Sequence, residues 1–370
     1  MDRAAASGAA GAGSNPARRV LILALLLTVG LGAWTARAQG LFSGQTRQER
    51  IKQWLQQKGA QADAEAENDA HFSIDYGGLT RKYNVHLPSD YNANTPMPAV
   101  IFLHGGGGSM RGAYWEGMNH SADKLGFILV IPDGTGRIAD RYLVWNAGQR
   151  GDSACCGYAV KNNIDDVGFI SAMIDQLKAK FNVDSSRIYA TGISNGGSMS
   201  YRLACELSGK IAAVATVAGW TEDRCSPSRP VAVMHVHGTG DLMSPYNGGQ
   251  TGVFMGGQKG ACVTIGPNGQ PDQGPQHPCL GPPASETVDT WLKKDQCSVN
   301  PSTVYQNGAV TCVSYNQCAG GSEVEFCTVE GGGHTWPSGM QYALVSKIGP
   351  VNHDMSFDQM WDFLKRHSLK

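Results

Sequence analysis

The chain has 370 residues, of which 41% are hydrophobic and 16% are charged, and its formal net charge is −1. This length suffices for one large hydrophobic core or two smaller ones. The balanced charge argues against a partner such as nucleic acid or an anionic membrane, and the 48 glycines fall in short runs without the fixed period of a collagen-like or solenoid protein.

The N-terminal segment has the pattern of an export signal. Arg18 and Arg19 precede the apolar run 20–34, which ends in the small-residue motif A-R-A at 36–38. We expect residues 1–38 to be a signal peptide cleaved after Ala38, leaving a secreted or periplasmic protein with no membrane attachment. The alternative is a membrane anchor, for which this run is short.

The region after the signal begins with a polar segment, 39–70. Within it, Ile51, Trp54 and Leu55 recur at helical spacing, which predicts an amphipathic helix from Gln45 to Gly59. This helix either packs on the main domain or leads into it. The main domain is expected to span residues 71–370.

The main domain alternates short apolar runs with helical segments. Continuous apolar runs predict strands buried on both faces of a largely parallel sheet, and the alternation with helices predicts an α/β fold with three layers. The predicted strands are Ala99–Leu103, Phe127–Ile131, Arg187–Thr191, Ala212–Val217, Val231–Val236 and Val324–Val329, and the predicted helices are Asp165–Phe181, Gly197–Leu207, Ser285–Lys294 and Phe357–His367.

The segment from Tyr246 to Pro283 breaks this pattern, being rich in Gly, Gln and Pro. Long loops of this kind inside a compact domain are usually functional. Two readings stay open: a lid or rim over a functional site, and a passive excursion on the surface.

The ten cysteines all follow the predicted cleavage site. An even count in an exported chain predicts disulfides, and the absence of a C-x-x-C pair argues against a structural zinc site. The sequence does not determine the pairing, but Cys205–Cys225 and Cys262–Cys279 each bracket a short excursion and are the first bridges we expect. Cys155 and Cys156 either form a vicinal disulfide or pair with distant partners, and with Trp145 they are expected to shape the wall of a cleft.

The motif G-I-S-N-G at 192–196 is the strongest chemical signal. It follows a predicted strand and opens a predicted helix, which is the setting of a nucleophile elbow: a sharp turn that exposes the Ser194 hydroxyl and aims the Asn195 backbone N–H at a developing oxyanion. The alternative is a glycine-rich turn with a solvated serine.

A serine nucleophile needs a base and an acid that orients the base. His334 follows the strand ending at Val329, and Asp241 follows the strand ending at Val236, so both are expected at the carboxyl edge of the sheet. The resulting chain order, Ser194, Asp241, His334, is that of the α/β-hydrolases. We therefore predict these three residues as the catalytic triad.

The run H-G-G-G-G at 104–108 ends an early strand. Glycines let backbone N–H groups approach an oxyanion closely, so we expect Gly106 or Gly107 to complete the oxyanion hole with Asn195. A phosphate-binding loop is disfavoured because no Lys-Ser/Thr follows the glycines.

His235 and His237 place two imidazoles on one face of a strand. A metal site is disfavoured because no third ligand of clear spacing accompanies them, so no metal is predicted. We interpret His237 as a support for the loop that carries Asp241.

Taken together, these motifs resemble the polyhydroxybutyrate depolymerase and feruloyl esterase family. The resemblance runs from about Phe72 to the C-terminus and rests on H-G-G-G-G-S at 104–109, W-N at 145–146, C-C-G at 155–157, D-D-V-G-F at 165–169, G-I-S-N-G at 192–196, H-G-T-G-D at 237–241 and G-H-T-W-P at 333–337. It implies an α/β-hydrolase fold, hydrolysis of carboxylic esters without a cofactor, and the same triad. The tannase-like branch fits poorly, because Ile193 and Gly333 stand where that branch has cysteines.

The substrate class implied is a small or oligomeric ester. Family members that attack solid polymer carry an additional surface-binding domain, for which the chain after its closing helix leaves no room, so we expect feruloyl-type or other aromatic esters, or soluble hydroxyalkanoate oligomers. Trp145 and Trp336 are expected to stack on such a substrate. Alternatives are a polyhydroxybutyrate depolymerase, a peptidase, and a non-catalytic binding protein on the same fold.

Overall fold

The computed structural model describes residues 47–138, 140, 142–148, 157–221, 225–251 and 280–370. The predicted signal peptide, the Cys155-Cys156 pair and the Cys262–Cys279 bridge lie outside these residues. So does most of the excursion 246–283. Its two ends are joined by the short strands β8 (Gly249–Gln250) and β9 (Leu280–Gly281).

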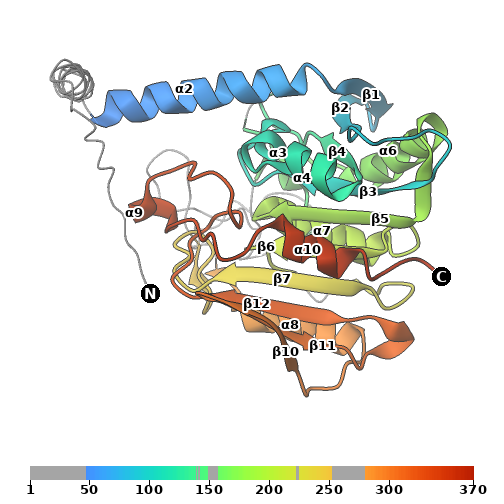
Figure 1. Cartoon of the computed structure of the whole chain (residues 1–370), viewed down its shortest axis with the longest axis vertical. Coiled ribbons are helices and arrows are strands. Elements are labelled where there is room, and N and C mark those ends of the chain that lie inside the picture. Colours follow the sequence, from blue (N-terminus) through green and yellow to red (C-terminus); the bar gives the residue numbers. More distant parts are fainter. Residues whose placement is uncertain (1–46, 139, 141, 149–156, 222–224, 252–279) are drawn as a thin grey trace, which may run out of the picture. The chain divides into compact units, whose positions relative to one another are not determined.

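A ten-stranded sheet organises the described part of the chain, in the order β1-β2-β4-β3-β5-β6-β7-β12-β11-β10 (Figure 1). The six central strands, from β4 to β12, pair in parallel, whereas the two outer strands on each side pair antiparallel. The strands are β1 Ala70–Tyr76, β2 Leu79–His86, β3 Met97–Leu103, β4 Ile128–Pro132, β5 Val183–Ile193, β6 Ala213–Val217, β7 Ala232–Gly238, β10 Ser302–Asn307, β11 Val310–Tyr315 and β12 Val324–Val329.

Helices cover both faces of the sheet, which confirms the predicted three layers. Alternate residues of β3 show this: Val100 and Phe102 pack with α3, α4 and α10, whereas Ile101 and Leu103 pack with α6, α7 and α8. The helices are α3 Arg111–Trp115, α4 Met118–Leu125, α5 Tyr158–Lys161, α6 Asp166–Lys180, α7 Asn195–Glu206, α8 Ala284–Lys294, α9 Val345–Ile348 and α10 Phe357–Leu364, with a short 3-10 turn, η2, at Ala319–Gly321.

The N-terminal helix α2 spans Arg47–Ala66, so it continues seven residues past the predicted end at Gly59. The chain divides into two compact units between Gln57 and Lys58, and the second unit contains the sheet. Ala62, in the second unit, is buried in the core. Within the described ranges, no helix combines the length and apolar character needed to cross a membrane.

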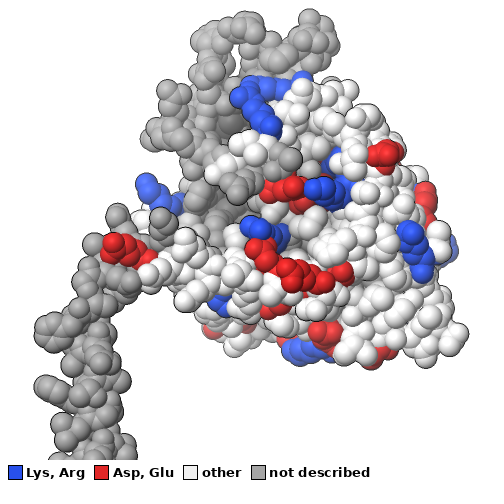
Figure 2. Space-filling view, turned by 90° about the horizontal axis from the view of Figure 1, so that it is seen from above, with Lys and Arg blue, Asp and Glu red and all other residues white. Residues whose placement is uncertain are grey.

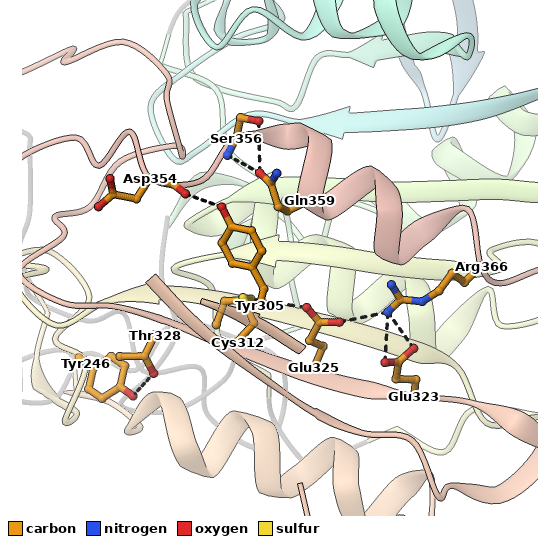
Figure 3. Close-up of a disulfide and its surroundings, with 11 residues drawn as sticks. Tyr246, Tyr305, Cys312, Glu323, Glu325, Thr328, Asp354, Ser356, Gln359 and Arg366 are labelled. Atoms are coloured by element: carbon orange, nitrogen blue, oxygen red, sulfur yellow. Dashed lines mark hydrogen bonds and ion pairs between the residues drawn. A yellow bond between two sulfur atoms is a disulfide. The ribbon is translucent and has the colours of Figure 1, made fainter. Parts of the chain in front are cut away.

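Three disulfides join described cysteines. Cys205–Cys225 was expected and is confirmed, and Cys297–Cys318 and Cys312–Cys327 are additional. The last of these links the antiparallel strands β11 and β12, and Figure 3 shows it together with Arg366, which binds Glu323 and Glu325. The cysteines with Glu325 form a group of ligand types that suit a metal, but both sulfurs are used in the disulfide.

Candidate active site

The three predicted triad residues follow three strands of the parallel part of the sheet. Ser194 follows β5, Asp241 follows β7 and His334 follows β12, and these strands are neighbours in the order β5-β6-β7-β12. Because parallel strands end at the same edge, all three side chains belong to one edge, toward which the β7 arrowhead points in Figure 1.

Ser194 occupies a sharp turn between β5 and α7. Its backbone has φ 58° and ψ −122°, a left-handed conformation that is strained for a residue with a side chain. The flanking glycines are required by space: a Cβ on Gly192 would lie 2.5 Å from the carbonyl oxygen of Leu103, and one on Gly196 would lie 2.0 Å from the same oxygen. The turn therefore has the geometry of a nucleophile elbow.

Asp241 and His334 form a direct pair. The Nδ1 atom of His334 lies 2.7 Å from Oδ2 of Asp241, and both residues are buried. The other carboxylate oxygen, Oδ1, accepts the backbone N–H groups of Met243 (2.8 Å) and Ser244 (2.7 Å). Burial alone would raise the pKa of Asp241, but the charge of His334 and hydrogen bonds from His237 and His334 lower it below its usual value. Asp241 is thus an ionised carboxylate at neutral pH.

The loop after β12 holds His334 by its backbone. The N–H of His334 donates to the carbonyl of Ile348 (2.5 Å), and the Tyr342 hydroxyl donates to the carbonyl of His334 (2.8 Å). Gly333 is needed here because a Cβ would lie 2.3 Å from the Ile348 oxygen. With Nδ1 bound to Asp241, Nε2 is the nitrogen left to act as a base.

The serine lies at the end of β5, which β6 and β7 separate from β12. Its N–H donates to the carbonyl of Val217 (2.8 Å), and Val217 lines the same small cavity as Thr335, the residue after His334. Among the described residues, however, no hydrogen bond joins Ser194 Oγ to His334 Nε2. The structure thus pairs Asp241 directly with His334, and Ser194 at the same sheet edge makes no such hydrogen bond to His334.

Two backbone donors were predicted for the oxyanion hole. Asn195 is the first residue of α7, where an N–H has no acceptor within the helix. The alternative that used Gly107 is wrong in this structure, because the Gly107 N–H donates to the Leu143 carbonyl (2.8 Å). Gly106 remains the candidate.

The peptide between Gly105 and Gly106 has a defined orientation. The Gly105 oxygen accepts from His104 Nδ1 (2.8 Å) and from the Gly108 N–H (3.0 Å). In a trans peptide the N–H points opposite to the C=O, so the Gly106 N–H is turned away from these partners. A Cβ on Gly105 would lie 3.7 Å from Cβ of Ser194, which places this peptide beside the nucleophile.

His104 acts on this peptide as a neutral imidazole. Its Nε2 accepts the N–H of Gly134 (3.0 Å), so its proton is on Nδ1, where it donates to Gly105. Burial lowers the pKa of His104 to about 4, which keeps it neutral at ordinary pH. In the sequence, His104 stands out only as the first residue of the glycine motif. The buried position after a strand was its available signal.

Trp145 and Trp336 do not have the predicted role. Both indoles are buried, at 0% and 1% exposure, and therefore offer no open face to a substrate. The Trp145 indole instead donates from Nε1 to the His104 carbonyl (3.0 Å). The backbone N–H of Trp145 donates to Asn195 Oδ1 (2.7 Å), and its carbonyl accepts from Asn195 Nδ2 (3.1 Å). Trp336 packs edge-on against Phe102. Both tryptophans therefore contribute buried packing, and neither forms a surface for a substrate.

The comparisons with known proteins agree on one family. A family model described as "Putative esterase" matches residues 77–328. Feruloyl esterase B of Piromyces equi is 30% identical over 298 residues, covering 78% of this chain and 46% of that protein. Feruloyl esterase C of Emericella nidulans is 30% identical over 179 residues, covering 46% of this chain and 58% of that protein.

The chain thus spans about half the length of each of these two relatives. Among solved structures, an acetyl xylan esterase from Aspergillus awamori is similar at 12% identity and a TM-score of 0.48, over 80% of this chain and 99% of that one.

Proposed function

The chain belongs to the esterase family of α/β-hydrolases, and from this premise we propose that it is a serine carboxylic-ester hydrolase working through an acyl-enzyme. The observation that carries the proposal is the buried Asp241–His334 pair, 2.7 Å apart, at the same sheet edge as the strained Ser194 turn. An acid-oriented imidazole at the same sheet edge as a serine hydroxyl is the arrangement that acyl transfer requires.

In the first half of the reaction, His334 Nε2 takes the Ser194 proton while Oγ attacks the ester carbonyl. This step needs the Oγ–Nε2 contact that the structure lacks, and such contacts commonly tighten only when substrate binds. The N–H groups of Asn195 and Gly106 donate to the oxyanion, and His334 then protonates the leaving alcohol. Water activated by His334 releases the acid in the second half.

For the substrate, we propose feruloyl-type or other aromatic esters, or soluble hydroxyalkanoate oligomers. The names of the two fungal relatives support the first class. A polyhydroxybutyrate depolymerase, a peptidase and a non-catalytic protein are the rival outcomes. We further propose that the protein is exported, which fits three disulfides between described cysteines.

The test uses the purified protein with methyl ferulate, a p-nitrophenyl ester, a hydroxybutyrate dimer and a matched p-nitroanilide. Ser194→Ala should lower kcat/KM on the preferred ester by about 10⁵- to 10⁶-fold, with the fold unchanged by circular dichroism. Ser200→Ala is the matched control on the same helix. It removes a buried hydroxyl that donates to the Gly196 carbonyl (2.9 Å) and should keep near-normal activity. Retained turnover by Ser194→Ala would remove this serine from the mechanism.

A further inference from the structure

A chain of buried hydrogen bonds lies behind the Asp241–His334 pair. The Tyr201 hydroxyl is 2.6 Å from His235 Nδ1, His235 Nε2 is 3.0 Å from His237 Nδ1, and His237 Nε2 is 2.7 Å from the Ser244 carbonyl. Each of the three side chains is at most 3% exposed. The mechanism above uses none of them.

When His237 is neutral, the last acceptor of this series of hydrogen bonds sets the direction of every bond. A carbonyl only accepts, so His237 must carry its proton on Nε2, and the Nδ1 of a neutral His237 then accepts from His235. His235 therefore carries its proton on Nε2, and its Nδ1 accepts from the Tyr201 hydroxyl. Burial and the neighbouring His237 lower the pKa of His235 well below its usual value, so His235 is neutral.

This series of hydrogen bonds ends at Ser244, on the loop that carries Asp241. The N–H of Ser244 donates to Asp241 Oδ1 (2.7 Å), while the carbonyl of the same residue accepts from His237. The His237 Nε2 atom also lies 3.5 Å from Asp241 Oδ2, the oxygen that binds His334. One N–H group thus restrains the loop and directs the positive end of its dipole toward the carboxylate.

Resting on the proposed function, we propose that Tyr201, His235 and His237 are positioning residues. They hold His237 as the Nε2–H tautomer, and that tautomer orients the Asp241 carboxylate toward His334. None of the three needs to touch the substrate. Both ring nitrogens of His235 and of His237 are already used in hydrogen bonds, so neither histidine has a free nitrogen for a metal.

The aromatic packing keeps both rings in place. His235 lies between Tyr201 and Phe326, with ring centroids 6.0 and 5.7 Å away, and His237 meets Tyr246 edge-on at 5.7 Å. Tyr246 is in turn held by a hydrogen bond to Thr328 (2.8 Å), which Figure 3 shows. Rotation of either ring would break these contacts as well as the chain.

A pair of substitutions at His237 separates donor from acceptor. His237→Gln places an amide N–H near the former Nε2 and keeps the donor, whereas His237→Asn keeps only the acceptor toward His235. We expect His237→Asn to lower kcat about 10- to 100-fold with little change in KM, and His237→Gln to recover most of that loss. Equal losses in the two variants would contradict the proposal.

The pH profile gives a readout that a packing role alone would not move. Without the His237 N–H, the Asp241 carboxylate is less stabilised by hydrogen bonding and attracts the proton of His334 more strongly, so the acid limb of kcat/KM should move to higher pH in His237→Asn. Tyr342 also faces Asp241, but burial and the charges of Glu116 and Asp241 raise its pKa, so it stays protonated.

Tyr201→Phe tests the far end of the chain. It removes the hydroxyl that selects the tautomer of His235 and keeps the ring stacked on Trp291. The Thr216 hydroxyl, 3.3 Å from His235 Nδ1, is a weaker substitute, so the same shift of the acid limb should appear at smaller size. Tyr189→Phe is the control: it removes a tyrosine hydroxyl that donates to the His367 carbonyl (2.8 Å), outside this series of hydrogen bonds, and its acid limb should stay in place.

A final experiment does not depend on activity. Long-range ¹⁵N–¹H spectra of histidine-labelled protein, assigned with the His237 variants, report the tautomer of each ring. We expect Nε2–H for both His235 and His237, and Nδ1–H on either neutral ring, or a cationic His237 at pH 7, would overturn the proposal. An inactive wild-type protein with the expected tautomers would instead refute the proposed function alone.

Discussion

The two sides of the candidate site are supported in different ways. On the nucleophile side, Gly192 and Gly196 let the Ser194 turn pass against the Leu103 carbonyl, so the shape of the backbone itself sets the geometry. On the acid side, Asp241 is held by N–H groups of its own loop and by the side chain of His334, which lies 93 positions later in the chain. The first kind of support is local and steric, and the second is tertiary and electrostatic.

Buried neutral imidazoles serve both sides. His104 directs a peptide group, because its Nδ1–H holds the Gly105 carbonyl, whereas His237 directs a carboxylate through the Ser244 carbonyl. Substitutions on the nucleophile side should therefore disrupt the Ser194 turn itself. Substitutions on the acid side should leave the fold intact and slow proton transfer. On the face seen in Figure 2, both acidic and basic side chains of the described residues are exposed.

The largest effect is expected from Gly196→Ala. The added Cβ would lie 2.0 Å from the Leu103 oxygen and 2.5 Å from the His104 oxygen, so α7 must move away from the end of β3 and activity should be lost. Stability should fall by about 2–4 kcal/mol, measured by urea unfolding. Gly209→Ala is the matched control, since nothing lies within 4 Å of the position of its added Cβ. A fully active Gly196→Ala would contradict the steric account.

Asp241→Asn should break the acid side without breaking the fold. The amide keeps the volume but loses the charge that orients and supports His334, so kcat should fall about 10⁴-fold. The melting temperature should change little in comparison with Gly196→Ala. A loss of kcat below tenfold would show that another group supports the imidazole.

His104→Ala tests the support of the oxyanion peptide. Without the Nδ1–H, the Gly105–Gly106 peptide is free to turn, and the expected cost is about 10- to 100-fold in kcat with KM nearly unchanged. His120→Ala, which removes an exposed histidine, is the control. An effect confined to KM would show that His104 serves substrate binding instead.

The smallest effect concerns a region outside both sides. Burial raises the pKa of Glu325 from 4.5 to about 7, so between these values the folded protein holds a proton that the unfolded chain has lost. Stability should therefore decrease as pH rises from about 4.5 to 7, and Glu325→Gln should flatten that decrease in urea unfolding at pH 5 and pH 7.5. Its kcat should match the wild type. An unchanged slope would contradict the assignment to Glu325.

The sequence was informative where structure follows from local pattern. Apolar runs predicted all six parallel strands. The G-x-S-x-G motif predicted the turn at Ser194, because the residues on either side of such a turn must be glycine for steric reasons. The outer strands β1, β10 and β11 were missed, since their buried positions alternate or are lacking and they carry no continuous apolar run. Asp241 and His334 were found from their places after β7 and β12, and the structure pairs them.

The errors and omissions have a common cause in tertiary contacts. Choosing between Gly106 and Gly107 requires the partner of each N–H, and Leu143, which accepts from Gly107, is far along the chain. The burial of Trp145 and Trp336 depends on elements packed around them. The Tyr201–His235 bond likewise joins residues 34 positions apart, so no motif could reveal it.

Covalent labelling tests the central claim most directly. An aryl fluorophosphonate is incubated with the wild type and with Ser194→Ala, and the modified peptide is located by tandem mass spectrometry. The account predicts one adduct on the wild type, at Ser194, none on the variant, and much slower labelling of Asp241→Asn. An adduct at another residue, or equal labelling of Ser194→Ala, would contradict a serine nucleophile activated by the Asp241–His334 pair.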